Sequence, residues 1–106
     1  MKLKKKMQRI AATMSLDQLK EHADHLTEEH RKTKEMVDQH AHKVALQRGH
    51  KPKGNELQRR QYQEAKDHYI QHELVHNFPK LHNTLHGLEK DALQARLAYK
   101  RAARNN

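Results

Sequence analysis

Apolar side chains recur at alternating intervals of three and four residues along most of this 106-residue chain. That spacing places them on one face of an α-helix, and no segment shows the alternation expected of a strand. Two stretches carry the spacing, and the first has polar residues in its middle: Leu16, Leu19, Ala23, Leu26, His30, Thr33, Val37, His40 and Val44, and then Phe78, Leu81, Leu85, Leu88, Ala92, Ala95, Tyr99 and Ala102. The pattern predicts an all-α fold, an antiparallel helical hairpin or three-helix bundle with coiled-coil-like seams.

Start and stop signals divide the chain into helices. Ser15 and Asn55 are each followed three residues later by glutamine, which predicts a capping box at both positions. Gly49 is expected to end the first long helix, and Pro79 suits the first turn of the last one. The predicted helices cover about 16–48, 55–77 and 79–104, within a single helical domain of residues 15–106.

The middle helix has an untidy pattern. Its apolar residues fall on two arcs when they are placed on a regular α-helix. Tyr69 lies with Leu57, Ala65 and Val75 on one arc, and Leu74 lies with Ile70 and Phe78 on the other.

Residues 1–14 are predicted to form a basic N-terminal arm. The arm has five positive charges and no acidic residue. Leu3, Met7, Ile10 and Met14 are spaced as on a short amphipathic helix. Its first residues resemble the basic part of a signal peptide, but no apolar stretch follows them and no segment is apolar enough to span a membrane. A cytoplasmic location is therefore expected.

The composition limits the core. Only 34% of residues are apolar, and the aromatic residues are one Phe and three Tyr. Such a chain can fill a thin seam between helices, or a core shared between subunits, so we expect a homo-oligomer such as a dimer, or part of a larger assembly. No cysteine is present, which excludes disulfides and thiolate metal sites.

Charge points to an anionic partner. Lys and Arg number 22 against 13 Asp and Glu, for a net charge of +9. This balance favours nucleic acid, a nucleoprotein or an acidic protein, and a membrane is less favoured because the arm has no Trp or Phe. The shortage of aromatic side chains argues against base stacking, so contacts without sequence selectivity to phosphates are expected. The candidate binding residues are Lys2, Lys4, Lys5, Lys6, Arg9, Arg48, Lys51, Lys53, Arg59, Arg60, Arg96, Lys100, Arg101 and Arg104.

Histidine is heavily over-used. Eleven residues are histidine, and His68, His72 and His76 step by four, so they share one face of a helix. Pairs at this spacing can chelate Zn or Ni. A histidine cluster can also act as a pH switch, or its members can be half-buried polar spacers between narrow helices.

One short run resembles a known motif. The segment from His72 through Glu73 and His76 to His82 is similar to the metzincin zinc-peptidase motif HExxHxxGxxH. The resemblance implies zinc on the three histidines, with Glu73 as general base. It covers 11 residues only, Pro79 stands where that family has Gly, and no methionine follows to supply the family's Met-turn.

As a working register for the helices, we take the chain to reverse direction at about residues 51–52 and again at about residue 78. This register gathers the histidines at one end: His22, His25, His30, His72, His76, His82 and His86. The other end collects the basic residues of 43–60 together with those of 96–104.

The functional expectation is a small non-enzymatic accessory or regulatory protein that docks through basic surfaces and requires no cofactor. The alternative is a histidine-rich Zn or Ni protein using His72, His76 and His82, and, behind it, a minimal zinc peptidase.

Overall fold

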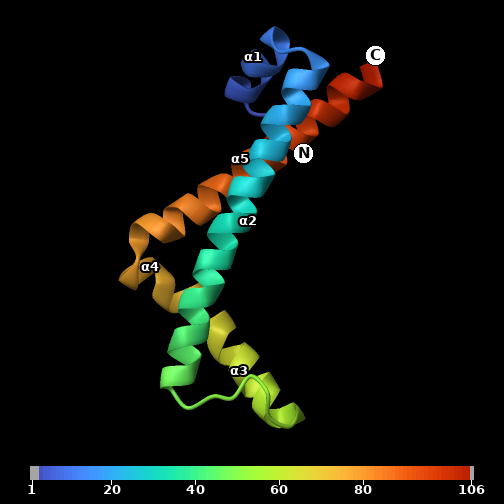
Figure 1. The fold of residues 1–106 in the computed structure, drawn as a ribbon. Helices are drawn as coiled ribbons and strands as arrows, with labels where there is room; N and C mark the ends of the chain where they lie inside the picture. The colour runs from blue at the N-terminus through green and yellow to red at the C-terminus, as the bar shows by residue number, and fades with distance from the viewer. Residues whose placement is uncertain (1–2, 106) are drawn as a thin grey trace. The chain divides into compact units, whose positions relative to one another are not determined.

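The computed structural model describes residues 3–105 and confirms the all-α fold class, with helices packed as in a hairpin or bundle (Figure 1). No strand occurs within the described residues. The elements are α1 (Lys5–Thr13), α2 (Leu16–Gln47), α3 (Glu56–His68), the π-helical turn η1 (Tyr69–Glu73), α4 (Leu74–Asn77) and α5 (Pro79–Asn105).

Both capping boxes form. The Gln18 backbone N–H donates to Ser15 Oγ at 3.2 Å, and the Ser15 N–H donates to Gln18 Oε1 at 2.9 Å. Asn55 and Gln58 exchange the same two bonds at 2.9 Å each. These bonds satisfy backbone donors that the first turn of a helix leaves without partners.

Helix α2 ends through a glycine in the left-handed region. Gly49 has φ +84°, its N–H donates to the Leu46 carbonyl at 3.0 Å, and the His50 N–H donates to the Ala45 carbonyl at 3.0 Å. Only glycine adopts this conformation without steric cost, so Gly49 ends the helix as its position in the sequence predicts.

The chain divides into two compact units. One, which we call the terminal unit, comprises residues 1–31 and 86–106, and the other, the central unit, comprises residues 32–85. Helices α2 and α5 contribute residues to both units.

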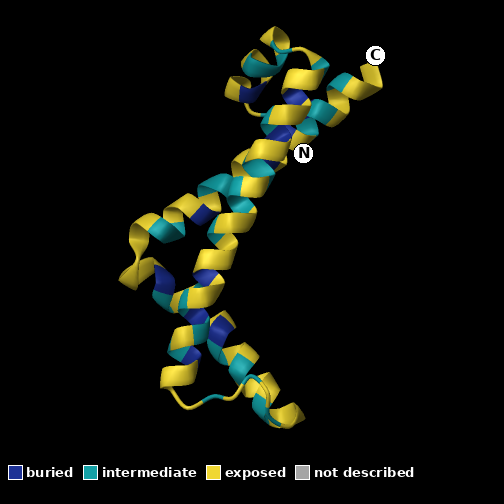
Figure 2. Cartoon of the chain, viewed as in Figure 1, coloured by how far each residue is buried: buried dark blue, intermediate teal, exposed yellow. Residues whose placement is uncertain are grey.

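In the terminal unit, α1 packs against the start of α2 and the C-terminal half of α5. Met7, Leu19 and Ala98 are buried together, and Leu3, Ile10 and Met14 pack around them (Figure 2). The apolar side of the predicted amphipathic arm is therefore enclosed by the unit's own helices. Burying a side chain such as Leu19 fully contributes about 1.5–3 kcal/mol.

A side-chain hydrogen bond fixes the beginning of α1. The Lys4 backbone N–H donates to Gln94 Oε1 at 3.1 Å, and Gln94 is buried on α5. This bond supplies an acceptor for a donor at the start of α1 and ties the N-terminal segment to the C-terminal helix.

The central unit has its own core. Val37 and Ala41 of α2 pack with Tyr69, Leu74 and Leu85. A polar link lies beside this core, where the buried Lys66 ammonium contacts Asp38 Oδ1 at 2.7 Å. Burial lowers the pKa of Lys66, but its hydrogen bonds to Asp38 and Tyr62 and the attraction of their charges outweigh burial and raise the pKa overall.

The π-helical turn explains the untidy pattern of the middle helix. The Leu74 N–H donates to the Tyr69 carbonyl, five residues earlier, so one extra residue is accommodated in the turn. Tyr69 and Leu74 then both reach the core, although a regular α-helix would place them on different arcs. The π-helical turn thus divides the middle helix at 69–73, whereas the sequence predicts one helix over about 55–77.

The working register is wrong for the C-terminal helix. It places Arg96–Arg104 with the Arg48–Lys53 loop, but Ala98 packs on Met7 and Leu19. The loop belongs to the central unit and Arg96–Arg104 to the terminal unit. The expected histidine group is divided in the same way, with His22, His25, His30 and His86 in the terminal unit. The structure instead pairs the C-terminal half of α5 with α1 and the start of α2.

Candidate nucleic-acid interface

Eight of the predicted basic residues belong to the terminal unit although they lie at opposite ends of the sequence. All eight are exposed. The predicted Lys2 lies outside the described residues. We call this set the terminal basic group: Lys4, Lys5, Lys6, Arg9, Arg96, Lys100, Arg101 and Arg104.

Two helices present the group. On α5, Arg96, Lys100 and Arg104 recur every four residues, so they follow one side of the helix at steps of about 6 Å. On α1, Lys5 and Arg9 have the same spacing. The burial of Met7 against Ala98 holds the two helices together and so brings the two sets of cations into one unit.

The chain's entire net charge lies in two segments, one at each end. Residues 1–14 and 92–106 hold nine of the 22 Lys and Arg residues and no Asp or Glu. The intervening residues 15–91 therefore have 13 basic and 13 acidic residues and are neutral overall. Packing α1 on α5 brings the described parts of the two segments, which hold eight of these nine basic residues, into one compact unit.

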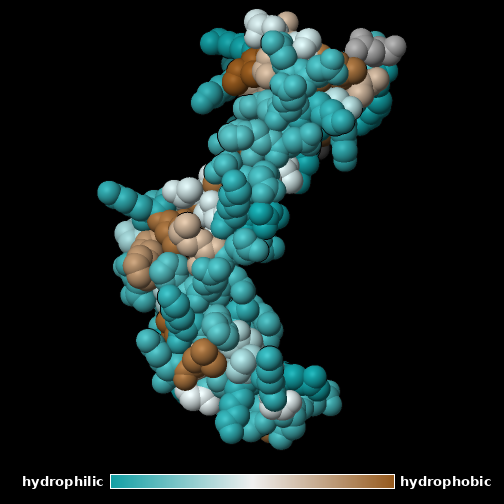
Figure 3. Space-filling view, in the orientation of Figure 1, coloured by the Kyte–Doolittle hydropathy of each residue, from teal (hydrophilic) through white to brown (hydrophobic). Residues whose placement is uncertain are grey.

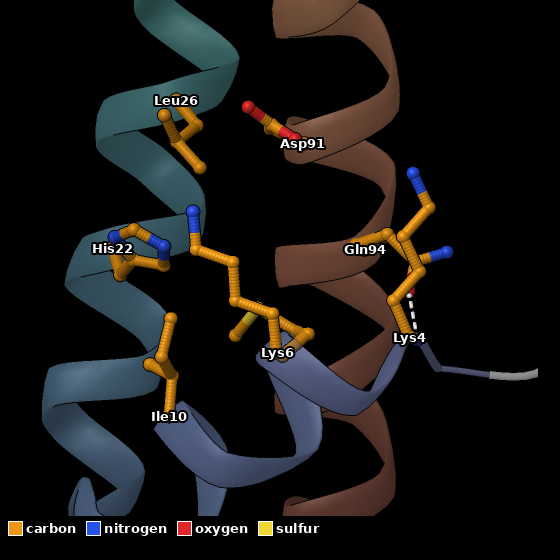
Figure 4. Close-up of a pocket in the computed structure, with 8 residues that line it drawn as sticks. Lys4, Lys6, Ile10, His22, Leu26, Asp91 and Gln94 are labelled. Atoms are coloured by element: carbon orange, nitrogen blue, oxygen red, sulfur yellow. Dashed lines mark hydrogen bonds between the residues drawn. The ribbon is translucent and has the colours of Figure 1, made fainter.

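A pocket opens beside the group, between α1, α2 and α5 (Figure 4). Met7, Ile10 and Leu26 give it an apolar lining. Its polar residues are Lys4, Lys6, His22, Asp91 and Gln94. Figure 4 shows the Lys6 side chain extending between α2 and α5, on the side where Leu26 and Asp91 lie.

The other predicted basic residues lie in the central unit, and two of them are in ion pairs. Arg48 donates to both oxygens of Glu73, at 2.7 and 2.5 Å, and Arg60 lies 3.8 Å from Glu56. The hydrogen bond to Glu73 raises the pKa of Arg48. The remaining members, Lys51, Lys53 and Arg59, are exposed. These five residues lie in the stretch 15–91, where acidic residues balance the basic ones.

The three histidines of the HExxH run and its extension lie in three successive elements. His72 lies in η1, His76 is exposed on α4, and His82 is half-buried on α5. Among residues 3–105, no group of three or more His, Cys, Asp or Glu side chains is placed to hold a metal ion. The Arg48 hydrogen bond lowers the pKa of Glu73, which makes this carboxylate a weaker base.

Two histidines of α2, His40 and His42, contact side chains outside that helix. His42 Nδ1 and the Tyr62 hydroxyl form a hydrogen bond of 2.5 Å between α2 and α3. The His40 ring lies against Phe78, with centroids 4.9 Å apart. These contacts are those expected of half-buried polar spacers in a thin helical seam.

Two features of the terminal unit were missed from the sequence. The lack of acidic residues in 92–106 is visible in the sequence and would have singled out this segment as the counterpart of the arm. The role of Gln94, which is buried and accepts from Lys4, leaves no such signal.

Figure 3 shows hydrophilic side chains over most of the visible surface of both units. Within the described part of the chain, no helix combines the length and apolarity that crossing a bilayer demands. No match to the chain was found among protein-family models, curated proteins or solved structures.

Proposed function

We propose that this protein is a non-enzymatic docking module that binds nucleic-acid phosphates through the terminal basic group. The observation that carries the proposal is the packing of α1 on α5, which joins two acid-free segments that hold the whole net charge. Clustered Lys and Arg residues attract the phosphate backbone and gain affinity by releasing its counterions.

The neighbouring side chains favour phosphate contacts over base reading. Tyr99 is the aromatic residue of the terminal unit, and it packs half-buried against the core. Stacking on unpaired bases needs exposed aromatic rings. The proposed contacts are therefore made to backbone phosphates and have no sequence selectivity, as on a duplex.

The burial of α1 disfavours a membrane surface as the partner. An amphipathic helix that lies in a bilayer must bury its apolar side in lipid. Here that side is occupied, with Met7 buried and Ile10 half-buried against α2 and α5. The exposed cations of α1 and α5 are then better suited to a polyanion.

The central test compares two variants that lose the same charge. The first changes Lys5, Arg9, Arg96 and Lys100 to glutamine, and the second changes the exposed Lys20, Lys34, Lys43 and Lys80. Each lowers the net charge of +9 by four. Binding of a fluorescent DNA duplex about two helical turns long, and of RNA of the same length, is measured by anisotropy over a range of salt concentrations.

The first variant is expected to bind far more weakly, and its plot of log affinity against log salt should be shallower by about 0.9 for each phosphate that it no longer neutralises. The control should stay close to the unchanged protein. Equal losses in both variants would mean that charge acts diffusely. Failure to bind either nucleic acid, with retained binding of polyglutamate, would assign the group to an acidic protein instead.

A further inference from the structure

Two histidines of the central unit lie side by side on an exposed helical surface. His68 is the last residue of α3 and His72 lies one turn later in η1. Both side chains are exposed. Their ring centroids are 4.9 Å apart, and the ring planes are tilted by 44° to each other.

This separation suits two imidazoles that share one metal ion. A metal–nitrogen bond of about 2.0–2.1 Å and a ligand angle between square and tetrahedral place the two centroids roughly 4.5–5 Å apart. The observed centroid separation of 4.9 Å falls in that interval. Imidazole nitrogen is a ligand that Zn²⁺, Ni²⁺ and Cu²⁺ all accept.

One carboxylate, that of Glu73, lies beside the pair. The Glu73 carboxylate lies close enough to His68 for the charge on His68 to contribute to the lowered pKa of Glu73, after the larger contribution of the Arg48 hydrogen bond. Because Arg48 holds both oxygens of Glu73, this carboxylate is a neighbouring charge and not a ligand.

We infer that His68 and His72 form a two-histidine site for a divalent transition-metal ion, with water in the remaining positions. This site differs from the set His72, His76 and His82 that the HExxH run implies. It shares one histidine with that set and lies a turn earlier, where the structure brings two rings together.

The position of the pair gives the ion a mechanical role. His68 and His72 flank the start of the π-helical turn, in which Leu74 bonds to Tyr69. An ion held by both rings ties the end of α3 to this turn. Because the unfolded chain does not hold the two rings together, the bound ion stabilises the folded state.

The test uses the full chain after EDTA treatment, titrated with Zn²⁺ and, separately, Ni²⁺ by calorimetry. His68→Gln and His72→Gln are each expected to lower the affinity of the tightest site by at least about tenfold, because one of two ligands is removed. His76→Gln and His82→Gln are the matched controls and should leave that affinity within about twofold.

A second readout does not depend on variants. Nuclear magnetic resonance of the imidazole Cε1–Hε1 groups is followed as Zn²⁺ is added, and the His68 and His72 signals should shift first and together. The proposal is overturned if His76→Gln or His82→Gln weakens binding as much as His72→Gln. It is equally overturned if the His68→Gln/His72→Gln double variant keeps the original affinity, which would mean nonspecific binding over the eleven histidines.

Discussion

At the scale of single residues, the Arg48–Glu73 ion pair gives the glutamate of the HExxH run a partner that its sequence does not indicate. The sequence shows Glu73 between two histidines, in the position of a peptidase's general base. The structure shows the same carboxylate bound at both oxygens by an arginine 25 residues earlier. Local spacing could not reveal this partner, because the contact depends on how α2 and η1 pack.

We expect the contribution of the Arg48–Glu73 pair to stability to depend on pH. Replacing Arg48 by Met should raise the pKa of Glu73 towards its ordinary value, since the Arg48 hydrogen bond is the main cause that lowers it. A carboxylate with a lowered pKa stabilises the fold above its unfolded pKa, and this contribution disappears as the pH falls through the folded pKa. The native protein and Arg48→Met should therefore differ in stability at neutral pH and converge in acid.

The measurement is a ¹³C titration of the Glu73 carboxyl in both proteins, with denaturant unfolding at several pH values. Arg60→Met is a suitable control, because Arg60 lies in an ion pair with a different carboxylate, Glu56, at 3.8 Å. An unchanged Glu73 pKa in Arg48→Met would contradict the assignment.

At the scale of elements, the beginnings and ends of helices were predictable and the course of the middle helix was not. Ser15, Asn55 and Gly49 act through neighbours within a few residues, so their sequence signals were sufficient. The π-helical turn is different, because its extra residue is selected by the burial of Tyr69 and Leu74 in one core. When the apolar residues are placed on a helix of fixed period, the pattern indicates an irregularity in this segment but does not identify it as a π-helical turn.

At the same scale, replacing either of two glycines by alanine should change the stability of the protein, in opposite directions. Gly49→Ala should destabilise the protein by about 1–2 kcal/mol, because an alanine at φ +84° brings its Cβ too close to the backbone. Gly87→Ala should stabilise it by about 0.5–1 kcal/mol, because Gly87 lies inside α5 and an added Cβ would meet nothing within 4 Å apart from the nearby backbone of its own helix.

Urea unfolding followed by circular dichroism measures both changes. Each glycine variant serves as the control for the other, since the added group is a single methyl in both. Destabilisation by Gly87→Ala would mean that α5 does not continue as a helix through this residue.

At the scale of the whole molecule, the all-α class followed from apolar spacing, but the pairing of segments did not. Periodicity shows which side of a helix is apolar. It does not show which other helix packs against that side. Ala98 packing on Leu19 and Met7 is a contact between distant residues with common side chains. The terminal basic group depends on this pairing, so its residues were predicted individually and their assembly was not.

The two compact units predict separable responses to core substitutions. Leu19→Ala removes a buried side chain from the terminal unit, and Leu74→Ala removes one from the central unit. Each should cost about 2–5 kcal/mol of stability. Hydrogen exchange measured by mass spectrometry should show the larger loss of protection in the unit that carries the substitution. Identical losses throughout residues 3–105 in both variants would mean that the units unfold only together.

The gathering of two acid-free segments in the terminal unit has a thermodynamic consequence. Like charges repel, so bringing these segments together works against their own electrostatics, and the repulsion is largest at low ionic strength. The same helices that carry the cations supply Met7 and Ala98 to the core. Any polyanion that neutralises the repulsion therefore acts as a folding ligand, and the terminal unit should melt at a higher temperature in the presence of heparin than in dilute buffer.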